Sequence, residues 1–191
     1  IGTGLVGSEM CIRDSICFGW RKWSGTCACS RSRYIRESFG GRSMKSILLL
    51  MGPNLNMLGE REPEIYGSAT MQDHIEDAEK VANEFGYELV HFQSNNEGDL
   101  VNQIHKARGK HTGIIINPGA LTHYGWSIHD ALLVYEGVII EMHLSNPNQR
   151  ESWRHTSVVA PVADGSIVGF GIQGYELSIR AFHQIIENDD K

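Results

Sequence analysis

Residues 47–67 read Ile-Leu-Leu-Leu-Met-Gly-Pro-Asn-Leu-Asn-Met-Leu-Gly-Glu-Arg-Glu-Pro-Glu-Ile-Tyr-Gly, and this stretch decides the fold. A short apolar run leads into a long loop rich in Gly, Pro and Asn, and a helix signal begins at Thr70. A strand, a loop and a helix in this order place the loop at the carboxyl edge of a parallel sheet, where α/β sheets bind ligands. Loops of this length in compact domains are typical of lids and binding loops.

The loop carries one guanidinium, Arg61, and one phenol, Tyr66, and Pro63 restricts the backbone between them. A free phenol has a pKa of about 10, so forming its phenolate at pH 7 costs roughly 4 kcal/mol. A permanently charged guanidinium nearby lowers that cost. The pair is therefore a candidate general base that forms when the loop closes. The alternative is a surface arginine near a half-buried tyrosine.

Apolar runs and helical patterns alternate along the rest of the chain. Thr70 and Asp73 form a capping-box signature, and Gly86 is a candidate stop for the helix between them. Five strand and helix units predict a single α/β domain, a doubly wound five-stranded parallel sheet in the order 2-1-3-4-5 with helices on both faces. The predicted strands are 44–51, 87–93, 113–116, 138–140 and 166–170, and the predicted helices are 70–85, 99–108, one that carries residues 130–134, and 173–187.

In this strand order the carboxyl ends of strands one, three and four lie side by side. They bring together a candidate base, a candidate acid and an anion-binding arginine, a combination that favours an enzyme. Strands two and five are expected to add little beyond Gln93 and Ser94. The edge collects Asn54, Arg61 and Tyr66, then Asn117 and His123, then Glu141, His143 and Ser145, with Arg154 just beyond.

Charge is distributed unevenly over the 191 residues, whose net charge is −6. Residues 1–43 carry seven Lys/Arg and three acids, whereas the rest carries ten Lys/Arg and twenty acids. An acidic domain without a basic stripe argues against nucleic acid as a partner. No apolar run approaches the ~20 residues that span a membrane, so no membrane partner is expected.

The sequence gives no indication of a metal site or of a catalytic thiol. The nine histidines form no H-E-x-x-H or Cys/His cluster, so no metal site is expected. Those at 74, 105, 129 and 183 fall on predicted helices and are expected to be surface or satisfied side chains. All four cysteines lie in the first 43 residues, and a domain without them suits a reducing, cytoplasmic compartment.

Residues 1–43 show no periodicity and are rich in Ser, Gly, Arg and Cys. Within them, residues 5–15 resemble the in-frame translation of a transposase adapter used in sequencing libraries. We expect an assembly artefact followed by translated upstream sequence, and a domain that covers 44–191. The alternative is an organelle transit peptide, because the segment is Arg- and Ser-rich and poor in acids.

Gly169-Phe-Gly-Ile-Gln-Gly174 fits the G-x-G-x-x-G pattern, but no further strand with an acid follows it, so tight helix packing is the favoured explanation. Other motifs stand in a specific order, and together they resemble the type II 3-dehydroquinate dehydratase family over residues 44–191. Tyr124-Gly125-Trp126 departs from the family's small or apolar stretch, which bears on trimer contacts or pocket shape. The motifs are Gly52-Pro-Asn-Leu-Asn-Met-Leu-Gly59, Arg61-Glu-Pro63, Tyr66-Gly67, Gln93-Ser94-Asn95, Asn117-Pro-Gly-Ala-Leu-Thr-His123, Glu141-Met-His-Leu-Ser-Asn146, Arg150-Glu151, Arg154-His155 and Gly169-Phe-Gly-Ile-Gln-Gly-Tyr175.

The resemblance implies a flavodoxin-like fold and anti elimination of water from 3-dehydroquinate to give 3-dehydroshikimate, without metal or cofactor. It implies that Tyr66 is the base, kept ionised by Arg61, and that Asn54 stabilises the enolate through a water. His143 is then the acid, tuned by Glu141. The implied substrate-binding set is Asn117, His123, Leu144, Ser145 and Arg154, with Asp130 reaching a neighbouring subunit in dodecamers built from trimers.

Two other functions remain open from the sequence. One is a flavodoxin-like module that binds a flavin or a phosphorylated ligand without catalysis, although no Ser/Thr-rich phosphate loop follows the first strand. The other is a non-catalytic oligomeric scaffold. The presence of Arg61, Tyr66 and His143 together counts against the scaffold.

Overall fold

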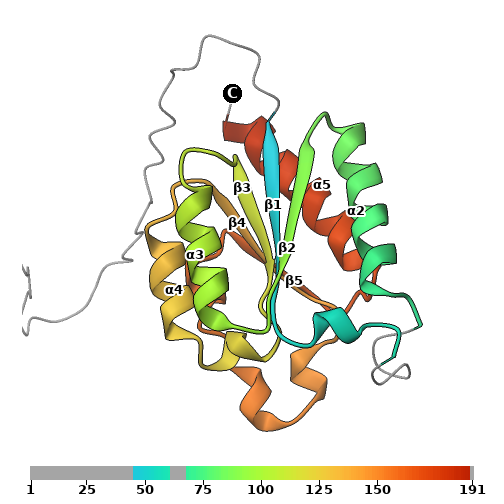
Figure 1. The fold of residues 1–191 in the computed structure, drawn as a ribbon, viewed down its shortest axis with the longest axis vertical. Helices are drawn as coiled ribbons and strands as arrows, with labels where there is room; N and C mark the ends of the chain where they lie inside the picture. Colours follow the sequence, from blue (N-terminus) through green and yellow to red (C-terminus); the bar gives the residue numbers. More distant parts are fainter. Residues whose placement is uncertain (1–44, 61–67, 190–191) are drawn as a thin grey trace, which may run out of the picture. The chain divides into compact units, whose positions relative to one another are not determined.

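The computed structural model describes residues 45–60 and 68–189, and these contain one parallel sheet in the predicted order β2-β1-β3-β4-β5 (Figure 1). The predicted segment 1–43 lies outside the described residues. Strand β1 is buried along its whole length, as expected for an interior strand with parallel neighbours on both sides. The strands are β1 Ser46–Met51, β2 Glu88–Gln93, β3 Gly113–Asn117, β4 Val138–His143 and β5 Gly165–Val168.

Helices cover both faces of the sheet, as the doubly wound fold requires (Figure 1). Helices α2 (Met71–Glu84) and α5 (Gln173–Asp189) pack on one face, and α3 (Glu97–Ala107) and α4 (Trp126–Leu133) pack on the other. Successive side chains of β1 point alternately into these two cores. No helix in 45–60 or 68–189 is long and apolar enough to cross a membrane.

Short 3-10 turns lie in the connections that follow β1, β3 and β4. They are η1 Leu55–Met57, η2 Gly119–His123, η3 Pro147–Gln149, η4 Ser152–His155 and η5 Ala160–Val162.

The start of α2 confirms the capping box read from the sequence. The Thr70 hydroxyl accepts a hydrogen bond from the backbone N–H of Asp73 at 3.2 Å, and the Asp73 carboxylate accepts one from the Thr70 N–H at 2.7 Å. Such a cap stabilises a helix by about 1 kcal/mol. Gly86 follows the helix with φ of 74°, a left-handed conformation that glycine adopts without strain.

Several local expectations are wrong. Strand β5 ends at Val168, two residues before the predicted end at 170. Strand β4 continues three residues beyond the predicted end at Ile140, because β5 pairs with it through His143. His74, expected at the surface or satisfied, is 1% exposed, and neither of its ring nitrogens has a hydrogen-bond partner.

Candidate active site

A cavity opens at the carboxyl edge of the sheet, where β1, β3 and β4 end. Loops after these strands supply its walls, as the strand order predicted. Seven of the eleven predicted site residues line it: Asn54, Asn117, His123, His143, Leu144, Ser145 and Arg154. Other lining residues, which lie within the quoted motifs but were not predicted as site residues, include Leu55, Leu58, Ala120 and Arg150.

Two of the remaining four predicted residues, Glu141 and Asp130, are described by the structure and do not line this cavity. Arg61 and Tyr66 lie outside the described residues. Glu141 is buried behind the cavity wall. Asp130 is exposed on α4 and does not line the cavity formed by its own chain.

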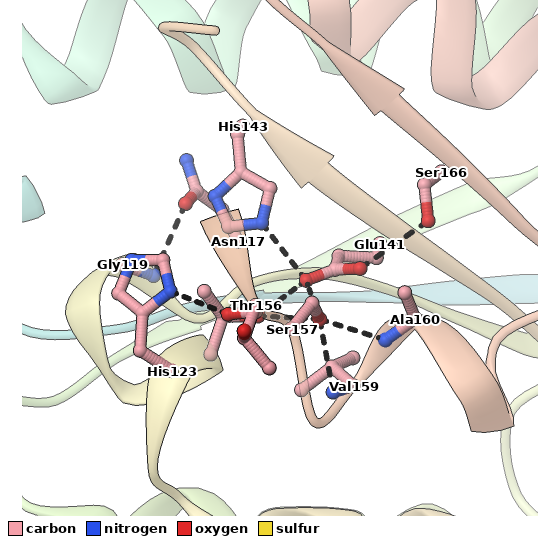
Figure 2. Close-up of polar contacts among 11 residues, drawn as sticks. Asn117, Gly119, His123, Glu141, His143, Thr156, Ser157, Val159, Ala160 and Ser166 are labelled. Atoms are coloured by element: carbon pink, nitrogen blue, oxygen red, sulfur yellow. Dashed lines mark hydrogen bonds and ion pairs between the residues drawn. The ribbon is translucent and has the colours of Figure 1, made fainter. Parts of the chain in front are cut away.

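Glu141 and His143 point to the same side of β4, because side chains two residues apart on a strand share a face. The His143 Nε2 atom lies 2.9 Å from Glu141 Oε1 (Figure 2). An ionised carboxylate can only accept, so Nε2 carries a proton and donates it in this bond. Nδ1 is then the nitrogen through which His143 can act on a ligand in the cavity.

Three hydroxyls surround the Glu141 carboxylate in addition to the imidazole (Figure 2). The Thr122 and Ser157 hydroxyls donate to Oε1 at 2.5 and 2.8 Å, and Ser166 donates to Oε2 at 3.2 Å. Burial on its own would raise the pKa of Glu141, but the bonds from His143, Thr122 and Ser157 outweigh it and lower the pKa. The carboxyl group is therefore held as an anion in a buried place.

The Ser166 contact corrects the expectation that strand five adds little to the site. Ser166 stands directly opposite Glu141 in the register of β4 and β5. Sequence reasoning missed all three hydroxyl donors, because Ser and Thr in loops and edge strands carry no distinctive spacing. A buried acid on a central strand was the one available signal, since such an acid needs donors.

Asn117, the last residue of β3, is fixed by contacts on both sides of its side chain. Its Oδ1 accepts from the Gly119 N–H at 3.3 Å, and its Nδ2 donates to the Tyr175 hydroxyl at 3.4 Å. Its backbone carbonyl accepts from the Gly52 N–H at 2.8 Å, which ties β3 to the loop after β1.

The end of strand β2 supports the loop after β1 through hydrogen bonds. The Gln93 amide donates to the carbonyl of Gly52 at 3.2 Å and to Asn95 Oδ1 at 3.1 Å. Asn95 Oδ1 in turn accepts from the backbone N–H of Asn54 at 2.9 Å. Asn54 has φ of 67°, a left-handed conformation that Asn tolerates better than most residues. The lining position of Asn54 is thus set by its own backbone and by its neighbours.

His123 and Arg154 form a second polar wall. His123 Nδ1 donates to the carbonyl of Thr156 at 2.7 Å, so Nε2 is the nitrogen left to accept from a ligand. Arg154 Nε donates to Glu151 at 2.7 Å, and its guanidinium lies 4.0 Å from the ring centroid of Trp153. The Trp153 ring also meets His123 edge-on, with centroids 5.2 Å apart. These contacts orient one cation and one imidazole toward a polar or anionic ligand.

Comparison with known proteins gives a consistent result. The family described as Dehydroquinase class II matches residues 45–183. A 3-dehydroquinate dehydratase of Halalkalibacterium halodurans is 49% identical over 148 residues, which cover 78% of this chain and 100% of that protein. One from Bacillus subtilis is 48% identical over 137 residues, 72% of this chain and 93% of that protein. The crystal structure of the type II dehydroquinase from Propionibacterium acnes matches with a TM-score of 0.71 at 40% identity, covering 73% of this chain and 97% of that one.

Proposed function

The chain belongs to the class II dehydroquinase family, and we propose on that basis that its cavity removes water from 3-dehydroquinate to give 3-dehydroshikimate, a step of the shikimate pathway. The observation that carries this is the convergence of His143, Asn117, His123 and Arg154 on one cavity within the matched region. The reaction breaks a C–H bond beside a ketone and a C–O bond next to it. It therefore needs a base, donors at the ketone oxygen and an acid for the leaving hydroxyl.

The residues divide between these tasks. Tyr66, with Arg61 stabilising its phenolate, removes the proton from C2, and Asn54 supports the enolate through a water. His143 protonates the departing C1 hydroxyl from Nδ1, while the contact to Glu141 fixes its Nε2 proton. Base and acid come from different strands, which suits an anti elimination because the two groups leave from opposite faces.

Substrate binding uses the other lining residues. Leu144 and Ser145 follow β4 directly, and their backbone and hydroxyl donors suit the substrate carboxylate. Arg154 suits a ring hydroxyl or the overall negative charge, and Asn117 and His123 complete the set. Asp130 is exposed on α4, where it can reach a neighbouring subunit's site in a dodecamer built from trimers. We further propose that the domain covers 44–191 and works in the cytoplasm.

The test is the ultraviolet absorbance of the conjugated product after 3-dehydroquinate is added to the purified protein. Turnover of 3-dehydroquinate should be unchanged after treatment of the protein with a metal chelator or with borohydride. Tyr66→Phe should lower turnover by several orders of magnitude, whereas Tyr124→Phe, at an exposed tyrosine outside the cavity lining, should not. No absorbance change, with a yellow protein or nucleotide binding in its place, would favour the non-catalytic module. Near-normal turnover of Tyr66→Phe would remove Tyr66 as the base.

A further inference from the structure

We propose that Ser157 is a positioning residue for the general acid: through a hydroxyl that can only donate, it fixes Glu141 as the ionised partner of His143. The inference rests on the proposed function. Ser157 follows η4 and is half-buried beside the β4 edge. Its hydroxyl contacts Glu141 Oε1 at 2.8 Å and two backbone N–H groups of its own segment (Figure 2).

The groups around the Ser157 hydroxyl determine whether it donates or accepts a hydrogen bond. A serine hydroxyl has one hydrogen and two lone pairs. The N–H groups of Val159 and Ala160 donate to its oxygen at 3.0 and 2.8 Å and occupy both lone pairs. The oxygen therefore has no lone pair left to accept from another group, and its single hydrogen must point outward.

Thr122 lies 2.8 Å from the Ser157 hydroxyl and 2.5 Å from Glu141 Oε1. Because both lone pairs of the Ser157 oxygen are occupied, the Thr122 hydroxyl cannot donate to it and must donate to Glu141. The Ser157 hydrogen then points at Glu141 Oε1, which lies 2.8 Å away. Two hydroxyl dipoles therefore point at Oε1, an arrangement set by backbone amides that do not titrate.

This arrangement decides where the proton between Glu141 and His143 resides. Two oriented hydroxyls and Ser166 favour the carboxylate form of Glu141, so the proton stays on His143 Nε2. A cationic ring can then give its Nδ1 proton to the C1 hydroxyl. The C1–O bond breaks, water leaves, and the enolate electrons form the C1–C2 double bond while the C3 ketone returns. If Glu141 held the proton instead, the ring would be a neutral imidazole and a much poorer donor.

The experiment compares Ser157→Ala with Ser157→Thr in the full chain, using 3-dehydroquinate. We expect Ser157→Ala to lower kcat about tenfold or more, the effect of losing one hydrogen bond to a charged group, with KM within twofold. Ser157→Thr keeps the hydroxyl and should stay within about threefold of the parent. The matched control is Ser178→Ala, which removes another buried serine hydroxyl, one that donates to the Gly174 carbonyl at 2.7 Å. It should lower the thermal midpoint without changing kcat.

Several outcomes would overturn the inference. These are an unchanged kcat in Ser157→Ala, equal loss in the Ala and Thr variants, or a rise in KM alone. If Ser157→Ala does not fold, Thr122→Val, which has the same volume but no donor, should show the same selective loss of kcat. A parent protein without activity on 3-dehydroquinate defeats the proposed function, whereas an active parent with an unaffected Ser157→Ala defeats only this inference.

Discussion

Asn117 Nδ2 donates a hydrogen bond to the buried hydroxyl of Tyr175 at 3.4 Å, which links the cavity wall at the end of β3 to the first turn of α5. Burial raises the pKa of Tyr175 to about 12, so the hydroxyl stays neutral under all working conditions. On its other side Asn117 accepts from the Gly119 N–H at 3.3 Å. The orientation of this lining amide is therefore determined in part by Tyr175, a buried residue that does not line the cavity.

Tyr175→Phe should weaken substrate binding more than the chemical step. The change leaves the buried Nδ2 of Asn117 without its partner, which costs about 1–3 kcal/mol shared between stability and binding. We expect KM for 3-dehydroquinate to rise about three- to tenfold, kcat to stay within threefold, and the free energy of unfolding to fall by about 1 kcal/mol. Steady-state kinetics measures KM and kcat, and urea unfolding measures the free energy of unfolding. A lower kcat at constant KM would contradict this account of Tyr175.

Glu141→Gln should remove most of the turnover while leaving the protein folded. Glutamine has nearly the same shape and can still accept from His143 Nε2, but it has no charge with which to stabilise a cationic ring. A loss of about 100-fold or more in kcat is expected, typical of removing assistance to a general acid. Glu84→Gln, at an exposed carboxylate on α2, is the control and should be fully active. Equal activity of the two variants would rule out a role for Glu141.

The same substitution should change the dependence of stability on pH. Because the fold lowers the pKa of Glu141 below its ordinary 4.5, its ionised form stabilises the protein above that pH, and the contribution is lost as pH falls through the folded value. Unfolding free energies of the parent and Glu141→Gln, measured at pH 7 and pH 4, should therefore differ less at the lower pH. If the difference in unfolding free energy between the two proteins were the same at pH 7 and pH 4, the fold would not be holding Glu141 ionised.

Much of the site was predictable because strand order alone brings certain loops together. Asn54, Asn117 and His123 follow recognisable strands, and parallel strands in the order 2-1-3-4-5 leave their ends side by side. The hydroxyl donors could not be predicted in this way. Ser157 and Ser166 reach Glu141 from separate elements, and only the register of β5 and the turn after η4 place them there.

Two local errors have physical causes. The prediction ended β4 before Glu141 because a charged residue interrupts an apolar run, yet four donors compensate for its burial. His74 was misplaced because a histidine does not contribute to the apolar pattern that Ile75, Ala78 and Ala82 form along α2. Position 74 lies one turn before Ala78 and shares its buried face, so the core there includes a polar ring.

Gly52→Ala should damage both folding and activity. A Cβ at this position would lie 2.4 Å from the carbonyl oxygen of Pro118, a backbone atom that cannot move aside without shifting the end of β3. The Gly52 N–H bond to the Asn117 carbonyl at 2.8 Å would be strained at the same time. We expect a loss of about 2–4 kcal/mol in unfolding free energy, in the range of severe overpacking.

Gly165→Ala is the matched control for that change, because a Cβ there meets nothing within 4 Å. It adds the same methyl group to a strand of the same sheet and should alter the unfolding free energy by less than about 0.5 kcal/mol. Chemical denaturation measures the loss of stability. Kinetic measurements on the protein that remains folded then show whether the site itself is distorted. Equal stability of the two alanine variants would show that the loop after β1 has more room than its contact with Pro118 suggests.

His74→Leu should stabilise the protein, and more so in acid. Burial lowers the pKa of His74 below 6.5 in the folded state, despite the opposing charges of Asp73 and Asp77. Between that lowered value and 6.5 the unfolded chain binds more protons, so stability is lost as pH falls below 6.5. Leucine also removes two buried ring nitrogens without partners, and we expect a gain of about 1 kcal/mol at pH 7 and a larger one at pH 5. The control is His105→Leu, at an exposed position on α3, which should not raise the free energy of unfolding at either pH. If the gain in unfolding free energy of His74→Leu were the same at pH 7 and pH 5, the core would not be keeping the His74 ring neutral.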